Sequence, residues 1–237
     1  MAAMDSEEDG AMRETTNPTE AEAAGADPRL PAPVRERWKI VIERATANAA
    51  AIQERIGPER QAVIAAYMDH IVKSTDPTWI RLRALNRLAD EHMAFTQGNV
   101  ACRRGCSHCC HCAVAVAKPE AEMIGMAIKR PPKKVSGVVK MDASGNFEGF
   151  DWGYHNPCSF LKNGECSIYE HRPLACRVHY NLDNDDLLCQ LNPPLGQPVP
   201  WLDATAYKKA YMHICGPKPK LADIREYFPK PTGADRT

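Results

Sequence analysis

The sequence predicts a mainly α-helical protein with little β structure, in which an N-terminal helical bundle packs on an irregular cysteine-rich region. Two observations carry this prediction. Apolar residues recur at helical spacing between residues 34 and 95, with charged residues between them. Residues 102–112 then hold five cysteines and two histidines, a density that core packing does not require. No βαβ alternation, internal repeat or glycine-rich phosphate loop is present in the sequence.

The N-terminal half predicts three amphipathic helices, over residues 33–56, 59–72 and 77–95. Gly57-Pro58 is expected to end the first helix, because glycine and proline are typical of helix ends. Asp76 is expected to cap the third helix, with Pro77 in its first turn. Short breaks between amphipathic helices favour a small antiparallel bundle.

Shorter elements are expected further along the chain. Residues 113–117 form an apolar stretch that fits a strand or a helix, and a helix is expected from Lys118 to about Lys129. Residues 130–157 are rich in proline, glycine and lysine, which favours irregular structure with a short hairpin near residues 144–146. Asn163-Gly164 predicts a tight turn, and residues 203–214 predict a further helix.

These elements suggest four regions. We expect a disordered acidic tail over 1–31, because its low hydrophobicity does not compensate for the entropy of ordering. A helical platform would follow over 32–99, then a cysteine-cluster metal-binding domain over 100–190. The C-terminal helix and a proline-rich tail would occupy 191–237.

Composition excludes several classes of partner. The formal net charge is zero, which provides no overall field to attract nucleic acid or an anionic membrane. No apolar run is long enough to span a bilayer, and no secretory signal is visible at the N-terminus. We therefore expect a cytoplasmic protein whose ten cysteines favour metal binding or redox chemistry over disulfides.

Thiolate and imidazole are the ligands that zinc and iron–sulfur centres prefer, so the cysteine segment predicts a metal site. Four thiolates around one divalent ion leave a net charge of minus two, which cationic neighbours can offset. The sequence offers such cations beside the cysteines: Arg103, Arg104, Lys118, Arg172 and Arg177. Gly105 permits the tight backbone that lets several sulfurs converge.

Spacing leaves the nuclearity and the identity of the metal open. Two zinc ions, a binuclear site and an iron–sulfur cluster all suit this number of thiols. The adjacent Cys109 and Cys110 suggest two metals, or two edges of one cluster. The triplet Cys102-x3-Cys106-x2-Cys109 also matches that of radical S-adenosylmethionine enzymes, but the strand–helix repeats of their barrel are missing here.

Histidines and carboxylates are weaker candidates. His70 and His92 lie inside helical patterns and are expected to be surface or core residues. Four histidines lie among the cysteines: His108, His111, His171 and His179. We expect each to support the metal ligands or face solvent rather than to bind the metal directly. Asp183, Asp185 and Asp186 are expected to form a solvated turn, since the other features of a calcium loop are absent.

The combined motifs resemble the YkgJ-type cysteine-cluster family, which is described as zinc- or iron-chelating domains. The matching parts are Cys102-x3-Cys106-x2-Cys109-Cys110, Glu120, Cys158-x-Phe160-Leu161, Gly164-x-Cys166-Ser167-Ile168-Tyr169 and Arg172-Pro173-x2-Cys176-Arg177. The motif is shared by flagellin lysine methylases, in which the cysteines are thought to hold an iron–sulfur cluster. Ser159 stands where the family usually has proline, and Cys112, His108 and His111 are additional.

We therefore expect a protein that chelates zinc or iron through two groups of cysteines. The expected ligands are Cys102, Cys106, Cys109, Cys110, Cys158, Cys166, Cys176 and Cys189, while the roles of Cys112 and Cys215 stay open. One alternative is an enzyme that uses an iron–sulfur or iron site for redox or group-modification chemistry. The other is a metal-handling or sensor protein. The sequence identifies no catalytic residue, no reaction and no protein partner.

Overall fold

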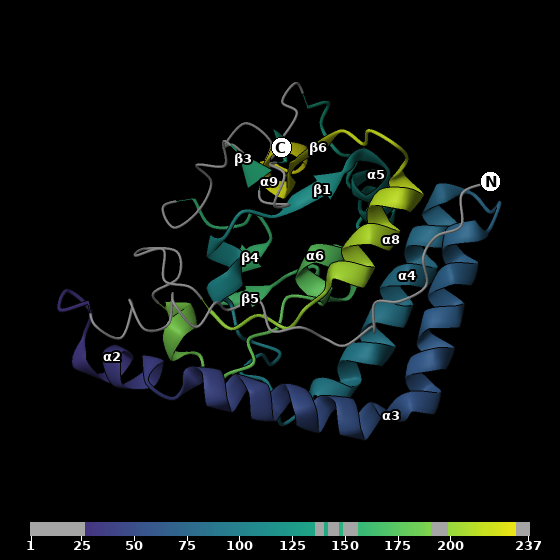
Figure 1. Cartoon of the computed structure of the whole chain (residues 1–237). Helices are drawn as coiled ribbons and strands as arrows, with labels where there is room; N and C mark the ends of the chain where they lie inside the picture. Colours follow the sequence, from purple (N-terminus) through teal and green to yellow (C-terminus); the bar gives the residue numbers. More distant parts are fainter. Residues whose placement is uncertain (1–26, 136–139, 142–146, 149–155, 191–198, 231–237) are drawn as a thin grey trace.

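The computed structural model describes residues 27–135, 140–141, 147–148, 156–190 and 199–230. Helices dominate this part of the chain and its strands are short, which confirms the predicted mainly α class (Figure 1). The predicted disordered tail lies outside the described residues up to residue 26. Leu30, near the end of that tail, is buried beside Val34 and Trp38 and so belongs to the folded chain.

The first predicted helix is interrupted. Helix α2 spans Ala32–Trp38, and helix α3 spans Val41–Lys73, so the continuous helix expected over 33–56 is wrong. Element α3 consists of two helices that meet at a kink, because Gly57 between them is non-helical, with φ 70° and ψ 158°, a conformation that is essentially restricted to glycine. The helix end predicted at Gly57-Pro58 is therefore confirmed. The two halves of α3 consequently run in different directions (Figure 1).

Helix α4 covers Thr78–Met93 and continues into a 3-10 turn, η1, over Ala94–Thr96. Pro77 occupies the N-cap position and no side chain caps the helix, so the prediction of an Asp76 cap is wrong. The Asp76 carboxylate instead accepts a hydrogen bond from the Ser74 hydroxyl at 2.8 Å. The expected helix over 77–95 is otherwise correct.

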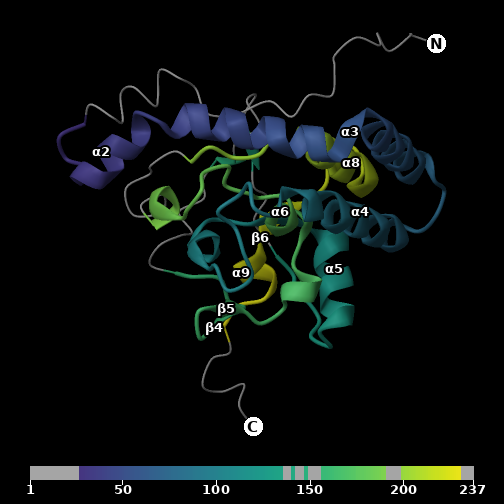
Figure 2. The same ribbon diagram turned by 90° about the horizontal axis from the view of Figure 1, so that it is seen from below.

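The helical core joins distant parts of the sequence. The second half of α3 lies beside α4, and helix α8, Thr205–Cys215, packs against both α3 and α4 (Figures 1 and 2). The buried residues of this core come from all three helices. Ile52 and Ile71 lie on α3, Leu82 and Leu85 on α4, and Ile214 on α8. The helical bundle predicted in the N-terminal half is therefore completed by a helix more than a hundred residues later.

Three short antiparallel strand pairs accompany the helices. Strand β1, Ala115–Ala117, pairs with β6, Leu221–Asp223, with Val116 opposite Ala222. The ambiguous stretch at 113–117 thus contains a strand. Strands β2, Lys140–Met141, and β3, Phe147–Glu148, form the expected hairpin, although the turn between them lies outside the described residues.

The third pair, β4 over Leu161–Lys162 and β5 over Glu165–Cys166, is closed by Asn163-Gly164 as predicted. Both turn residues have positive φ, 50° and 80°, as this tight turn requires. The remaining short elements are helix α5, Lys118–Ala127, the 3-10 turns η2, His108–His111, and η3, Tyr169–His171, and helices α6, Leu174–Arg177, and α9, Ile224–Tyr227.

The cysteine-rich region lies beside the helical core and is closed by the C-terminal segment. In Figure 2, β4, β5 and α9 lie on the side of α6 that faces away from α3. Strand β6 and helix α9 follow the proline-rich stretch, and Ala222, Ile224 and Phe228 are buried. A C-terminal helix followed only by a tail is therefore wrong for these residues. Among the described helices, none combines the length and the hydropathy that crossing a membrane requires.

Candidate metal centre

The segment 102–112 folds into consecutive tight turns that bring its sulfurs together. Gly105 has φ 88°, and the Cys106 amide donates to the Arg103 carbonyl at 3.0 Å. The η2 turn follows, in which the Cys110 amide donates to Ser107 at 3.0 Å. The glycine at position 105 thus has the role expected from the sequence.

One group of sulfurs, which we call the open group, lines a small cavity. It consists of Cys102, Cys106, Cys109, Cys112 and Cys189, and the side chains of His108, His179 and Trp201 complete the lining. The centre of a water-sized sphere can occupy about 20 Å³ of this cavity. That is room for about one water molecule or an ion, and too little for an organic substrate.

A second group, which we call the buried group, packs against the buried side chains of Phe160, Ile168 and Phe228; of its members only Cys158 is itself buried, and the others are half-buried. It consists of Cys110, Cys158, Cys166 and Cys176. The Cys158 amide donates to the Cys110 carbonyl at 2.8 Å, which ties the first cysteine segment to the second. The β4–β5 hairpin and helix α6 position Cys166 and Cys176. None of the ten cysteines, all of which the structure describes, forms a disulfide.

Cys109 connects the two groups. The Cys110 thiol donates a hydrogen bond to the Cys109 sulfur, which lowers the pKa of Cys109 to about 7. A Cys109 thiolate in turn raises the pKa of Cys102, Cys106 and Cys189 in the open group. It does the same for Cys110, Cys166 and Cys176 in the buried group. The adjacent Cys109 and Cys110 thus belong to different groups, and the hydrogen bond between their sulfurs links the two.

Backbone amides donate hydrogen bonds to several of these sulfurs. Cys106, Cys158 and Cys166 each accept from the amide two residues later, namely His108, Phe160 and Ile168. The Asn181 amide donates to the Cys102 sulfur at 3.3 Å, and the Asn181 side chain donates to Cys189 at 3.3 Å. Hydrogen bonds to the charged form stabilise thiolates, which are the ligating species.

Burial and mutual repulsion oppose those amides. Burial raises the pKa of Cys102 to about 12 and that of Cys112 to about 11, and nearby thiolates add to the effect. Burial likewise raises the pKa of Cys176 well above its usual value. A cluster of buried thiolates therefore needs a cation beside it, and a bound metal ion supplies that charge.

Arg172 and Arg225 are the principal cations at the centre. Arg172 is half-buried above the Tyr169 ring, and its charge lowers the pKa of Cys102, Cys109, Cys166 and Cys176. Arg225, on α9, lowers the pKa of Cys112 and Cys158 and donates to the carbonyl oxygens of Cys110 and Cys112. Sequence reasoning missed Arg225, which lies far from any cysteine in the chain.

The expected role of Arg177 as a counter-charge is wrong. Its guanidinium pairs with Asp90 on α4 and donates to the carbonyl oxygens of Glu170 and Arg172. Arg104 and Lys118 form exposed ion pairs with Glu170 and Glu122. Arg103 is exposed, and its charge lowers the pKa of Cys106.

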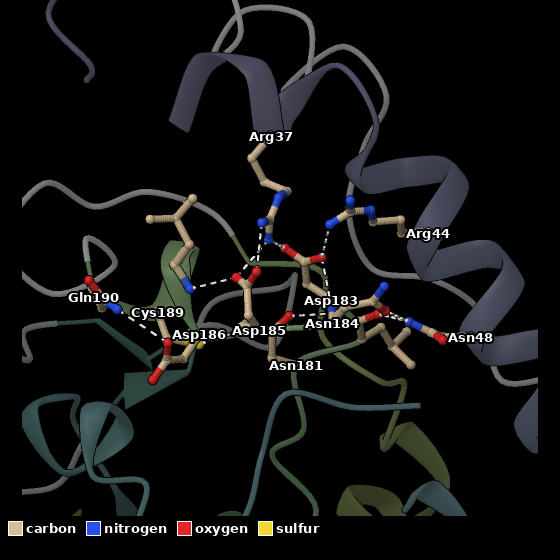
Figure 3. Close-up of polar contacts among 12 residues, drawn as sticks. Arg37, Arg44, Asn48, Asn181, Asp183, Asn184, Asp185, Asp186, Cys189 and Gln190 are labelled. Atoms are coloured by element: carbon tan, nitrogen blue, oxygen red, sulfur yellow. Dashed lines mark hydrogen bonds and ion pairs between the residues drawn. The ribbon is translucent and has the colours of Figure 1, made fainter. Parts of the chain in front are cut away.

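An ionic network anchors the loop at residues 183–186, which leads directly into the helical residues that include Cys189. The guanidinium of Arg37, on α2, donates hydrogen bonds to both Asp183 and Asp185 (Figure 3). Two of these bonds, of 2.7 and 2.6 Å, join Arg37 to Asp185. Arg44, on α3, pairs with Asp183 at 3.5 Å. Asp183 is fully buried, so the solvated turn expected from the sequence is wrong for this aspartate, whereas Asp185 and Asp186 are half-buried. The network instead fixes the loop against the first two helices.

Asp186, in the same loop, points toward the cysteine segment. Its carboxylate lies 3.0 Å from Nε2 of His108 and accepts from Gln190 at 3.2 Å (Figure 3 shows the contact with Gln190).

His179 packs against Trp201 with 3.7 Å between ring centroids, and burial lowers the pKa of His179 to about 4, which keeps its imidazole neutral.

The eight cysteines expected as ligands all belong to the two groups. Cys112 joins the open group, whereas Cys215, at the end of α8, packs in the helical core. His92 also lies in that core, 2.9 Å from the Tyr207 hydroxyl. Sequence reasoning missed Asn181 and Arg37, because neither lies in a recognisable motif.

The comparisons with known proteins support the same chemistry. Residues 101–194 match the family model CxxCxxCC, described as "Putative zinc- or iron-chelating domain". This match confirms, for that segment, the resemblance to the YkgJ-type cysteine-cluster family. It spans less than half of the chain. Neither the curated proteins nor the solved structures gave a match.

Proposed function

We propose that this protein binds zinc or iron through thiolates of the open and buried groups. The proposed ligands are Cys102, Cys106, Cys109, Cys110, Cys158, Cys166, Cys176 and Cys189. One observation carries the proposal. Cysteines from 102–112 and from 158–189 gather in two groups that are linked at Cys109, although long stretches of sequence separate them. Thiols alone gain little from such crowding, whereas a soft cation is bound by it.

The donors around the sulfurs support the same proposal. Backbone amides approach Cys106, Cys158 and Cys166, and Asn181 approaches two further sulfurs. Such hydrogen bonds hold thiolate ligands in place and tune the metal they bind. Arg172 and Arg225 reduce the net negative charge of a thiolate-rich centre.

Of the two alternatives, the metal-handling protein has support from the open group. Its sulfurs line a cavity that suits an ion and is too small for an organic substrate. An iron–sulfur enzyme draws its support from the number of thiols, since nine cysteines in the two groups exceed the needs of one tetrahedral ion.

Elemental analysis and an absorption spectrum of protein purified without air test the proposal. We expect at least one equivalent of zinc or iron per chain, with visible sulfur-to-iron bands only if thiolate-bound iron is present. Cys176→Ser should reduce the metal content, while Cys215→Ser, a cysteine in the helical core, should leave it unchanged. A folded chain that contains neither metal contradicts the proposal.

Removal of the metal by a chelator gives a second test. Binding and folding are coupled in thiolate sites, so residues 100–190 should lose structure. The core of α3, α4 and α8 contains no proposed ligand, and it should retain much of the helical circular dichroism. Unchanged hydrogen exchange across residues 100–190 after complete metal removal would contradict a structural role for the metal.

A further inference from the structure

Three donors of different chemistry converge beside the open group. The sulfur of Cys106, a ring nitrogen of His108 and a carboxylate oxygen of Asp186 lie within 4.8 Å of one another. All three residues are half-buried, so their donor atoms are neither enclosed in the core nor fully solvated. No other such group of three is found among the residues that the structure describes.

Two separate segments hold these donors. Cys106 and His108 lie at the start of the η2 turn, where the His108 amide donates to the Cys106 sulfur. Asp186 comes from a loop that Arg37 and Arg44 anchor through Asp183 and Asp185. The anchored loop therefore presents Asp186 to the cysteine segment in a defined position (Figure 3).

The spacing suits coordination of one ion. Nε2 of His108 and Oδ2 of Asp186 are 3.0 Å apart. Two ligands about 2.0 Å from a tetrahedral zinc ion lie roughly 3.3 Å from each other, so a small adjustment would place an ion between them. Gln190 donates to the other oxygen of Asp186, an outer contact of the kind that orients a ligating carboxylate.

We propose that Cys106, His108 and Asp186 form a separate zinc site with an open coordination position. This inference rests on the proposed function, because Cys106 is one of the proposed metal ligands. Sulfur, nitrogen and oxygen donors together suit zinc, whereas iron–sulfur clusters favour thiolates, and magnesium and calcium favour oxygen. One thiolate and one carboxylate also balance the charge of a divalent ion, which the all-thiolate buried group does not.

An open position distinguishes this site from the buried group. Zinc sites with four protein ligands are typically structural, while those with three keep a position for water or an exchanging ligand. The site adjoins the cavity of the open group, so an ion bound there can be reached from the solvent. Zinc should therefore leave this site faster than it leaves Cys110, Cys158, Cys166 and Cys176.

The experiment compares zinc release from the zinc-loaded full chain to a weak colorimetric chelator. His108→Ala and Asp186→Asn remove one proposed ligand each. His213→Ala and Glu122→Gln are matched controls, because both residues are exposed and neither belongs to the three-donor group or adjoins a proposed ligand. We expect the wild type and both controls to release a rapidly exchanging zinc equivalent ahead of a slow fraction. Each ligand variant should bind that equivalent roughly 10-fold more weakly or worse.

Circular dichroism of each variant establishes that it is folded, and Asp186→Asn preserves the shape of the side chain it replaces. Cobalt(II) titration of the same proteins provides a second readout, since the ligand variants should alter the visible bands of the weaker equivalent. Release and spectra equal to those of the wild type in both ligand variants overturn the three-donor site alone. A wild-type chain that binds neither zinc nor iron contradicts the proposed function instead.

Discussion

Asn181 contacts two sulfurs of the open group at once. It is fully buried, its amide donates to Cys102, and its side chain donates to Cys189. Its side-chain oxygen accepts from the Asp183 amide at 2.9 Å, which links the sulfurs to the loop that Arg37 anchors. One uncharged residue thus contacts ligands from two different segments, Cys102 through its backbone amide and Cys189 through its side chain.

We predict that Asn181→Ala weakens metal binding about 10-fold or more, because an outer hydrogen bond to a ligand is lost. The free energy of unfolding should fall by about 1–3 kcal/mol, since buried partners lose a hydrogen bond. Burial raises the pKa of Cys189 and the Asn181 hydrogen bond opposes that rise, so loss of the bond should move metal loading to higher pH in the variant.

Chelator competition at several pH values and urea denaturation measure these effects. Asn184→Ala is the matched control, because the Asn184 side chain in the same loop contacts Asn48 on α3 and no sulfur. Equal metal affinities for Asn181→Ala and Asn184→Ala would contradict a role of Asn181 in holding the ligands.

At the scale of elements, helix α5 holds helix α6, which carries Cys176. The buried carboxylate of Glu120 accepts from the Leu174 amide at the start of α6 and from the Tyr211 hydroxyl of α8, each at 2.7 Å. Burial raises the pKa of Glu120. Three helices therefore meet at one side chain, and the position of Cys176 depends on it.

We predict that Glu120→Ala lowers the free energy of unfolding by about 2–4 kcal/mol, because two buried donors lose their acceptor. Metal content should also fall, since α6 loses the contact that places Cys176. Thermal denaturation and elemental analysis measure both. Glu122→Ala, an exposed residue of the same helix, should change neither, and equal losses in the two variants would rule out this account.

At the scale of the whole molecule, the C-terminal segment closes the cysteine-rich region. Strand β6 pairs with β1, directly after the cysteine segment, and Asp223 and Arg225 form a buried ion pair of 2.8 Å. Arg225 also donates to carbonyl oxygens of Cys110, Cys112 and Asn156. Two separate parts of the matched family segment, at Cys110 and Cys112 and at Asn156, are thereby joined to a residue outside it.

We predict that Arg225→Ala lowers the free energy of unfolding by about 3–5 kcal/mol, because Asp223 keeps a buried charge without its cation. Metal retention should fall with it, as the carbonyls of Cys110 and Cys112 lose their donor. Denaturation with and without metal measures the change. Lys218→Ala, at an exposed position in the same segment, is the control, and a variant no less stable than that control would contradict the prediction.

Helical periodicity predicted the helices of the N-terminal half well, and glycine and asparagine predicted the β4–β5 turn. These features depend on local conformational preference, which neighbouring residues decide. The break between Trp38 and Val41 was missed because apolar spacing continues across it. Gly57-Pro58 correctly predicted the point at which the first half of α3 ends, since glycine adopts the positive φ found there.

By itself, the sequence determined the kind of chemistry, because clustered thiols and imidazoles bind soft metals wherever they fold. It also identified the two cysteine segments, through spacing that residues 101–194 share with a known family. Only the tertiary structure decided which sulfurs share a group, and that Asp186, Asn181 and Arg225 reach them. The contacts of His108 with Asp186, Cys102 with Asn181 and Cys110 with Arg225 join residues 78 to 115 positions apart, and no local pattern in the sequence encodes such long-range packing.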